Sequence, residues 1–431
     1  MIGMESLVQG IEIPLMQRVR YIMEDSRIAD VRAVILSSFE QSGIAKRLPK
    51  GGRIAIAVGS RGICQLPEQV RTVVEWFKSH ATEPFIVPSM GSHGNATAKG
   101  QLGVLEALGV TEKSMGCPIR SAMDVVEVGT LPEFSLPVYM DKNAYEADGV
   151  FVINRVKLHT TFTGKHESGL AKMLTIGLGK QIGAASCHAL GFGHFHEIMP
   201  AMAALILRKH PQILGGLGIV ENAYDHPCYL EVMPAESLLE RDAALLEMSK
   251  KVMPALPMRT ADILLIDRIG KNISGLGADP NITGRYISKF KSNGVCMTRM
   301  GFLDLCEESH GGACGIGCAD AISQRLYDKI DFEATYANVI TSTNLPAAAT
   351  PVVVPTDNLL IRMLIRTCNC GTKPLRMLRI RDTLSLNHLL VSPALADELA
   401  ADSRCELVGE PYPLPFDEKG NLTDFATWDC F

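Results

Sequence analysis

The first half of the chain repeats a short apolar run, a glycine-rich loop and an amphipathic stretch. Residues 53–59 (RIAIAVG) predict a strand, and the loop SRGICQ follows. Residues 66–80 then place apolar side chains at helical spacing, which predicts a helix. Alternation of this kind predicts crossover units around a mainly parallel sheet, and therefore the α/β fold class. Further strands are predicted at 84–88 and 149–153, and further helices at 98–108 and 237–253.

A second α/β domain is predicted after the segment MPALPM, which supplies two prolines. Residues 261–269 (ADILLIDRI) then start a new strand, and the loop GKNISGLG follows it. We therefore expect one domain at 1–258 and another at 259–431. Within the second domain, strands are predicted near 337–342 (ANVITS) and 351–354 (PVVV).

Polar side chains gather directly after the predicted strands of the first half. Ligands of open parallel sheets bind at the carboxyl ends of the strands. We therefore expect three loops that are distant in sequence to meet at one site. The side chains concerned are Ser60 and Arg61, then Ser92, His93 and Asn95, then Lys157 and His159.

Composition narrows the range of partners and compartments. The 431 residues are 47% hydrophobic and 21% charged, and 42 basic against 47 acidic residues give a net charge of -5. No basic stripe favours nucleic acid, and no apolar run is long enough for a membrane span. The N-terminus does not resemble a secretory signal, so we expect a cytoplasmic protein whose twelve cysteines are reduced. The expected partner is a small molecule, and the oligomeric state stays open.

The stretch 154–188 (NRVKLHTTFTGKHESGLAKMLTIGLGKQIGAASCH) is the richest in candidate chemistry. It combines several ionisable side chains with five glycines. Buried charges need partners, so core elements rarely combine such residues. The interleaved apolar residues, such as Leu174 and Leu178, are equally unsuited to an open surface loop. We therefore interpret this stretch as part of a site.

The segment SGLAKMLTIGLGKQ, extended to His188, resembles the nickel-dependent lactate racemase family, whose members racemise or epimerise 2-hydroxy acids with a nickel pincer nucleotide. The resemblance implies that Lys172 carries the cofactor, pyridinium-3,5-bisthiocarboxylic acid mononucleotide. It implies that His188, sixteen residues later, is a nickel ligand. A soft, sulfur-rich set with one imidazole suits square-planar Ni(II). The family fold has two α/β domains with mainly parallel sheets and the active site in the interdomain cleft. Residues 1–258 would then bind the cofactor and catalyse, and residues 259–431 would close the cleft.

The same resemblance assigns catalytic roles to two histidines. One is His93 in the loop MGSHGNAT, and the other is His159 in VKLHTTF. His166 is the rival of His159, because it lies closer to Lys172. The spacing between histidine and lysine is longer here than in the lactate enzyme, so the choice between the two stays open.

Substrate contacts are also implied by the resemblance. Arg61 in VGSRGI resembles the family arginine that binds the substrate carboxylate, and a guanidinium matches a carboxylate in two hydrogen bonds. The family has an acidic residue three positions earlier, where this chain has Val58. The polar loop 270–285 offers Lys271 and Asn272 as further substrate ligands, although Asn, Asp and Gly also favour ordinary turns.

The expected reaction is inversion of C2 of a 2-hydroxy acid by hydride transfer to and from the lysine-tethered cofactor, with paired imidazoles moving the hydroxyl proton. Val58 and the polar loop favour a sugar acid such as gluconate over lactate. One alternative is a metal-dependent hydrolase or lyase that uses His188, His194 and Glu197. Another is a non-catalytic protein that binds a metal or cofactor. Cysteine groups such as Cys306, Cys314 and Cys318 lack iron–sulfur spacing.

Overall fold

The computed structural model describes residues 3–60, 62–287, 295–425 and 428, and it divides into two compact units. The central unit, named for its place in the sequence, comprises Glu24–Met253. The terminal unit comprises Met1–Met23 together with Pro254–Phe431. Each unit is a mixture of helices and a mainly parallel sheet, as the alternating pattern predicted.

The central unit is built on a five-stranded sheet in the order β3-β2-β6-β7-β8. The first four strands are parallel, and only β8 runs antiparallel to its neighbour β7. The side chains of β2 after Arg53 are all buried, because helices cover both faces of the sheet. The strands are β2 (Arg53–Val58), β3 (Glu83–Pro88), β6 (Gly149–Arg155), β7 (Ile213–Glu221) and β8 (Pro227–Pro234).

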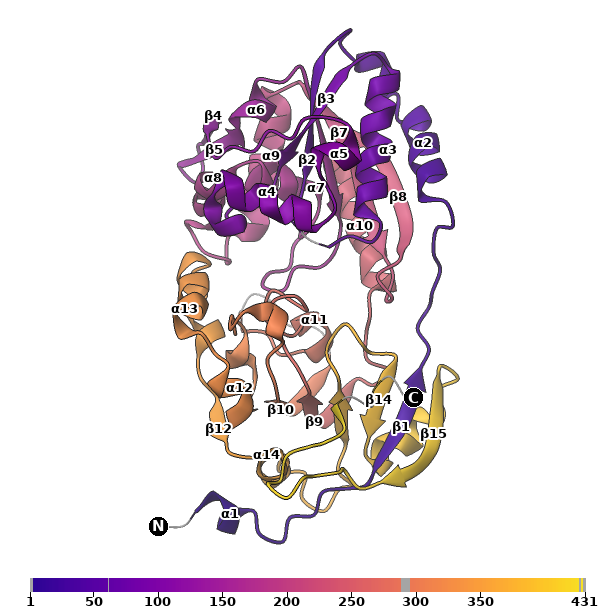
Figure 1. Cartoon of the computed structure of the whole chain (residues 1–431), viewed down its shortest axis with the longest axis vertical. Helices are drawn as coiled ribbons and strands as arrows, with labels where there is room; N and C mark the ends of the chain where they lie inside the picture. Colours follow the sequence, from indigo (N-terminus) through magenta and orange to yellow (C-terminus); the bar gives the residue numbers. More distant parts are fainter. Residues whose placement is uncertain (1–2, 61, 288–294, 426–427, 429–431) are drawn as a thin grey trace. The chain divides into compact units, whose positions relative to one another are not determined.

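The helices of the central unit form two layers, one on each face of the sheet (Figure 1). Each layer packs on the sheet through its own apolar core. Alternate residues of β2 point to opposite cores, with Ile54 and Ile56 on one face and Ala55 and Ala57 on the other. The first core is covered by α2 (Val31–Ser42), α3 (Leu66–Ser79) and α5 (Glu112–Met115). The second is covered by α6 (Lys142–Tyr145), α7 (Leu170–Lys172), α8 (Lys180–His188), α9 (Phe195–Lys209), α10 (Leu238–Val252) and the hairpin of β4 (Val125–Leu131) and β5 (Leu136–Asp141). Helix α4 (Ala98–Ala107) follows β3.

The terminal unit contains an eight-stranded sheet in the order β12-β11-β10-β9-β13-β14-β1-β15. The first five strands are parallel and the last three pair antiparallel. The strands are β1 (Met16–Tyr21), β9 (Thr260–Ile266), β10 (Cys296–Phe302), β11 (Ala321–Ser323), β12 (Val352–Val354), β13 (Met377–Ile380), β14 (His388–Val391) and β15 (Cys405–Tyr412). The helices are α1 (Met4–Leu7), α11 (Pro280–Thr283), α12 (Gln324–Asp328), α13 (Phe332–Thr341), α14 (Asp357–Thr367) and α15 (Pro393–Leu399).

Strand β1 makes the division differ from the predicted domains at 1–258 and 259–431. It lies between β14 and β15, where Figure 1 shows it as an indigo strand between two yellow ones. Its backbone hydrogen bonds therefore join the first residues of the chain to the last third, and Met1–Met23 belong to the terminal unit. The second division, between Met253 and Pro254, falls within the proline-containing segment.

One predicted strand is wrong. Residues 337–342 lie mostly in helix α13, which spans Phe332–Thr341. The side chain of Asp331 accepts a hydrogen bond from the backbone of Ala334 and so caps the helix. Thr335 and Val339, one helical turn apart, are its buried residues. Capping and one-sided burial override the strand preference of the β-branched residues. The predicted strand near 351–354 is confirmed as β12.

Among the described residues, no helix combines the length and the apolar character needed to cross a bilayer. The described cysteines are all free thiols.

Candidate functional site

The carboxyl ends of four parallel strands bring the central unit's polar loops to one edge of its sheet. Val58 pairs with Pro88 and with Ile153, so the residues that follow β2 and β3 lie beside the end of β6. Strand β7 ends on the same edge, because it runs parallel to β6. This is the edge at which ligands of such sheets bind.

Lys172 is the last residue of the short helix α7 and immediately precedes a π-helical turn, Met173–Gly177. The start of α7 is fixed by Asp242 of α10, whose Oδ1 accepts the backbone N–H of Leu170 at 2.7 Å. A Cβ at Gly169 would lie 2.3 Å from that same oxygen, so only glycine permits this approach. A buried hydrogen bond to a carboxylate is worth about 1.5–3 kcal/mol, so Asp242 holds the lysine-bearing turn firmly. Turns of π-helix occur frequently at functional sites.

His188 ends helix α8, and one nitrogen of its imidazole is buried. Nδ1 is buried without a hydrogen bond to any of the described residues. Burial, and to a smaller extent the Lys172 ammonium, together lower the pKa of His188 to about 4. The imidazole is therefore neutral at pH 7, with a nitrogen lone pair that nothing in the described chain uses. Lys172 therefore lies near enough to His188 for its charge to influence the pKa of the imidazole.

His159 packs on the same aromatic side chains as His188. The ring centroid of Phe195 lies 4.8 Å from that of His188 and 6.5 Å from that of His159. Phe192 also contacts both imidazoles, at 5.1 and 6.2 Å. Nδ1 of His159 accepts the backbone N–H of Thr161 at 3.1 Å. The aromatic cluster therefore brings one predicted catalytic residue and the predicted metal ligand together.

His166, the rival of His159, is engaged elsewhere. Its ring is buried, and Nδ1 lies 3.0 Å from Oδ2 of Asp242. The same carboxylate holds the backbone of Leu170, so His166 and Asp242 together support the start of α7. His166 is therefore held by Asp242, and His159, which packs in the same aromatic cluster as His188, is kept as the candidate catalytic residue.

His93 lies in the loop after β3 and its side chain is exposed. Its Nδ1 is hydrogen-bonded to the hydroxyl of Ser60, which follows β2. The neighbouring residues Gly91 and Gly94 both have positive φ, 59° and 65°. The backbone N–H of Gly91 donates to the carbonyl of Gly177 at 3.3 Å, which joins the His93 loop to the π-helical turn.

The loop after β2 is tied to the ends of β6 and β7. Oε1 of Glu221 accepts the backbone N–H of Cys64 at 2.7 Å. The other oxygen of Glu221 is paired with Arg155, which also lies 3.0 Å from Asp225. Burial raises the pKa of Glu221, and Arg155 opposes that rise. Arg61, the predicted carboxylate ligand, belongs to this loop but lies outside the described residues.

Lys271 and Asn272 belong to the terminal unit, whereas the other predicted site residues belong to the central unit. Both side chains are exposed. The backbone N–H of Lys271 donates to the hydroxyl of Ser309 at 2.8 Å, and the Asn272 side chain is hydrogen-bonded to the thiol of Cys306.

Residues that the sequence reasoning missed hold the site in place. Asp242, Glu221 and the fully buried Lys180 all contact backbone or side chains of the predicted site. Lys180 belongs to the segment SGLAKMLTIGLGKQ that carries the family resemblance, but the sequence reasoning gave it no role. Its contacts involve residues far away in sequence, so the sequence carries no direct signal of them.

The alternative metal cluster does not form. His194, His196 and Glu197 are exposed, and each imidazole lies 3.6 Å from a Glu197 oxygen. Across the described part of the chain, no three His, Cys, Asp or Glu side chains are grouped so that they could hold a metal ion. Neither the trio His188, His194 and Glu197 nor the described cysteines of the terminal unit form such a group.

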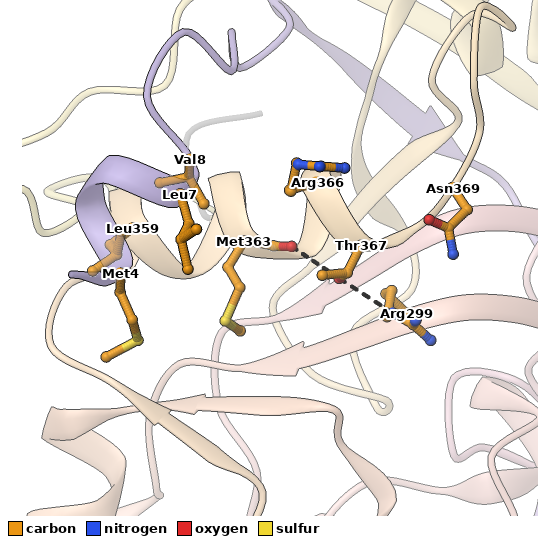
Figure 2. Close-up of a pocket in the computed structure, with 9 residues that line it drawn as sticks. All are labelled: Met4, Leu7, Val8, Arg299, Leu359, Met363, Arg366, Thr367 and Asn369. Atoms are coloured by element: carbon orange, nitrogen blue, oxygen red, sulfur yellow. Dashed lines mark hydrogen bonds between the residues drawn. The ribbon is translucent and has the colours of Figure 1, made fainter. Parts of the chain in front are cut away.

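A hollow of about 460 Å³ in the terminal unit holds none of the predicted site residues. Figure 2 shows Met4 and Leu7 of α1 and Leu359 and Met363 of α14 along it, with Arg299 of β10 near Thr367. The lining is mostly apolar. The hollow offers no group of titratable side chains comparable to the strand ends of the central unit.

Comparisons with known proteins give structural neighbours only. No family model matches the chain, and no curated protein matches its sequence. The lactate racemase apoprotein from Thermoanaerobacterium thermosaccharolyticum is similar in structure with a TM-score of 0.48 and 14% identity, over 86% of this chain and 99% of that one. A structural-genomics crystal structure of a Thermotoga maritima protein has a TM-score of 0.44 and 15% identity, over 61% of this chain and 69% of that one.

Proposed function

We propose that this protein is an isomerase that inverts C2 of a 2-hydroxy acid and that Lys172 holds a nickel pincer nucleotide. The observation that carries the proposal is the pair of Lys172, which precedes the π-helical turn, and His188, which ends the helix that follows the turn. The Lys172 ammonium acts electrostatically on His188, whose buried Nδ1 has no hydrogen-bond partner among the described residues. The sequence resemblance assigns these two positions to cofactor attachment and nickel binding.

The residues present fit such a cofactor. A metal-binding imidazole must be neutral, and burial keeps His188 neutral far below pH 7. A single imidazole beside a soft donor set suits Ni(II), and the lysine amine is the group that would form the covalent bond. When bound, the cofactor would supply the hydride acceptor that the protein's own side chains lack.

His93 is suited to move the hydroxyl proton of the substrate. The Ser60 hydroxyl on its Nδ1 can donate or accept a hydrogen bond, so Nε2 of His93 can be proton-free or protonated without losing that contact. His93 would take the hydroxyl proton while the hydrogen on C2 leaves, and would return it when that hydrogen comes back. An imidazole nitrogen can both accept and donate a proton, so one side chain serves both steps.

His159 is suited to a different part of the same reaction. Because its Nδ1 accepts the Thr161 N–H, the neutral ring carries its proton on Nε2. Nε2 is therefore the nitrogen that can donate a hydrogen bond to a bound substrate. We assign His159 a hydrogen bond from Nε2 to the substrate oxygen, which stabilises the negative charge that develops there.

The substrate contacts are Arg61 for the carboxylate, with Lys271 and Asn272 for further hydroxyls. Val58, at the position where the family has an acidic residue, is fully buried at the end of β2. This chain therefore lacks the acidic residue that the family has three positions before the arginine, and the substrate need not be lactate. We propose a longer, polyhydroxylated acid such as an aldonate, with gluconate as the first compound to test.

The test is inversion of a panel of 2-hydroxy acids by the cofactor-loaded protein, followed by chiral chromatography. Intact mass should show a covalent adduct in the wild type and in Lys165→Ala, a matched exposed lysine in the same stretch. Lys172→Ala should lose the adduct and all turnover. An adduct retained in Lys172→Ala, or inversion of none of the acids, would refute the proposal.

The origin of the hydrogen on C2 provides a second check. Inversion in deuterated water should keep the original hydrogen on the carbon, because a hydride does not exchange with solvent. Rapid incorporation of deuterium at C2 would instead indicate proton abstraction by a side chain.

A further inference from the structure

Lys180 is a fully buried lysine whose ammonium meets three acceptors. Nζ donates to the carbonyl of Pro88 at 2.5 Å and to Oε1 of Gln101 at 3.1 Å, and it lies 3.1 Å from Oδ2 of Asp141. Lys180 and Asp141 both have completely buried side chains. Burial favours the neutral form of each and so lowers the pKa of Lys180 and raises that of Asp141, while their mutual attraction opposes both changes. Two hydrogen bonds and a carboxylate at ion-pair distance suit an ammonium, so we take Lys180 as charged.

The side-chain amide of Gln101 in α4 connects Lys180 to the His93 loop. Its Oε1 accepts from Lys180, which leaves the amide nitrogen facing the loop. Nε2 donates to the carbonyl of Gly91 at 2.8 Å and to the carbonyl of His93 at 3.3 Å. The lysine thus fixes which way the buried amide points, because an ammonium can only donate. The amide in turn fixes the backbone on both sides of the loop's turn.

The backbone conformation of Lys180 also indicates that its surroundings fix its position. Its φ is +56°, in the left-handed region that glycine adopts freely and a lysine adopts at a cost. Residues in such conformations persist when their surroundings determine them, and they gather at functional sites. Lys180 begins α8, the helix that ends at His188, and follows the π-helical turn after Lys172. Its side chain reaches back to Pro88, the last residue of β3.

We propose that Lys180 and Gln101 are positioning residues that hold His93 in register with the segment bearing Lys172 and His188. This inference rests on the proposed function. Lys180 is anchored by Asp141 at the end of β5, so the loop, the hairpin and α8 are joined at one buried ammonium. Loss of this connection should leave cofactor attachment intact and displace the His93 imidazole.

The principal variants are Gln101→Glu and Gln101→Met. Glutamate keeps an acceptor for Lys180 and loses both donations to the loop, while methionine loses all three contacts. In the cofactor-loaded enzyme, each should lower kcat by about 100-fold, the loss expected for displacement of a catalytic group by about 1 Å. KM and nickel content should change little, because neither residue is proposed to contact substrate or metal.

The double variant Lys180→Met with Asp141→Asn separates positioning from stability. It removes both buried charges, and the introduced amide keeps an oxygen that can accept the backbone N–H of Ala144, as the Asp141 carboxylate does. Such exchanges of buried ion pairs are often neutral for stability. If the pair serves stability alone, the folded double variant keeps wild-type kcat, and the proposal is overturned. If the double variant does not fold, the two Gln101 variants test the proposal by themselves, because both retain the Lys180–Asp141 ion pair.

Histidine NMR of the unloaded protein provides a readout that does not depend on turnover. In both Gln101 variants the ring resonances of His93 and their pH titration should change, with His93→Gln identifying its signals. Those of His226, which contacts Asp25 in a different loop, should not change. Thr72→Val, a buried polar exchange in α3, is the control for kcat and spectra. Unchanged His93 signals would contradict the proposal, whereas changed signals in a protein that inverts no hydroxy acid would refute only the proposed function.

Discussion

The loop after β9 in the terminal unit and the segment 154–188 in the central unit are both rich in polar residues, yet the two regions use them differently. In the terminal unit, the loop after β9 satisfies its own polar atoms. Asp279 accepts from the backbone and side chain of Asn281 at 2.9 and 2.8 Å, and Arg285 donates to Asp320 at 2.7 Å. In the central unit, by contrast, His188 keeps a buried nitrogen without a partner among the described residues.

This difference explains why a polar loop is a poor indicator of a site by itself. Asn, Asp and Gly stabilise turns through local hydrogen bonds, and the loop 270–285 is largely built that way. A buried polar atom that the fold leaves unsatisfied costs free energy, so a ligand that completes it is favoured. We therefore expect substitutions in the central unit to change function, and substitution of the internally bonded Asp279 in the loop 270–285 mainly to change stability.

The largest effect is expected for His188→Ala. Without its imidazole the neutral nitrogen donor is lost, so the protein should lose nickel during dialysis and turnover should fall to background. The matched control is His194→Ala, an exposed histidine at the start of the next helix. Nickel content measured by elemental analysis checks the prediction. Equal nickel in both variants would contradict the assignment of His188.

Substitution by glutamine is expected to lower kcat by different amounts at the two candidate catalytic histidines. His93→Gln should lower kcat by about 10²–10⁴-fold, because glutamine does not accept and return a proton. His159→Gln should be milder, since the amide still donates a hydrogen bond. His159→Leu, which removes the donor, should lower kcat by about 10²-fold. Steady-state kinetics of the three loaded variants test this order. If His159→Gln is as damaging as His159→Leu, His159 acts as a base and our assignment is wrong.

A smaller effect is expected in the pH dependence of the free energy of unfolding. The folded-state pKa of His188 is lowered to about 4, below the ordinary 6.5 of an unfolded chain. Between these values the unfolded state binds the extra proton, so His188 contributes stability above pH 6.5 that is lost as pH falls towards 4. The slope is at most about 1.4 kcal/mol per pH unit. Urea unfolding of the unloaded protein should show this component in the wild type and its absence in His188→Gln. Identical pH profiles would contradict the lowered pKa.

The smallest effect is expected in the terminal unit. Asp279 caps α11 and holds Asn281, so Asp279→Ala should lower the free energy of unfolding by about 1 kcal/mol. The kinetic constants of the loaded enzyme should stay unchanged, since the carboxylate is used within the loop. Denaturant unfolding and substrate titration measure the two quantities. A large rise in KM without loss of stability would show that this loop binds substrate through Asp279.

Much of the fold could be predicted because local patterns and tertiary structure agree. The predicted strands at 84–88 and 149–153 are confirmed as β3 and β6, and the helix at 66–80 as α3. The N-terminal strand β1 was not predicted, because its partners lie near the other end of the chain. The predicted strand at 337–342 failed because its β-branched residues occur at a spacing that also suits a capped helix.

The sequence by itself determined the alternation of strands and helices, and it placed Lys172 and His188 sixteen residues apart in one glycine-rich segment. Only the tertiary structure decided that His166 lies against Asp242 and that Lys180 reaches Pro88, 92 residues earlier. The physical reason is the range of the interactions. Hydrophobic periodicity depends on residues that are close in sequence. The partner of a buried charge depends on which distant element the fold packs against it.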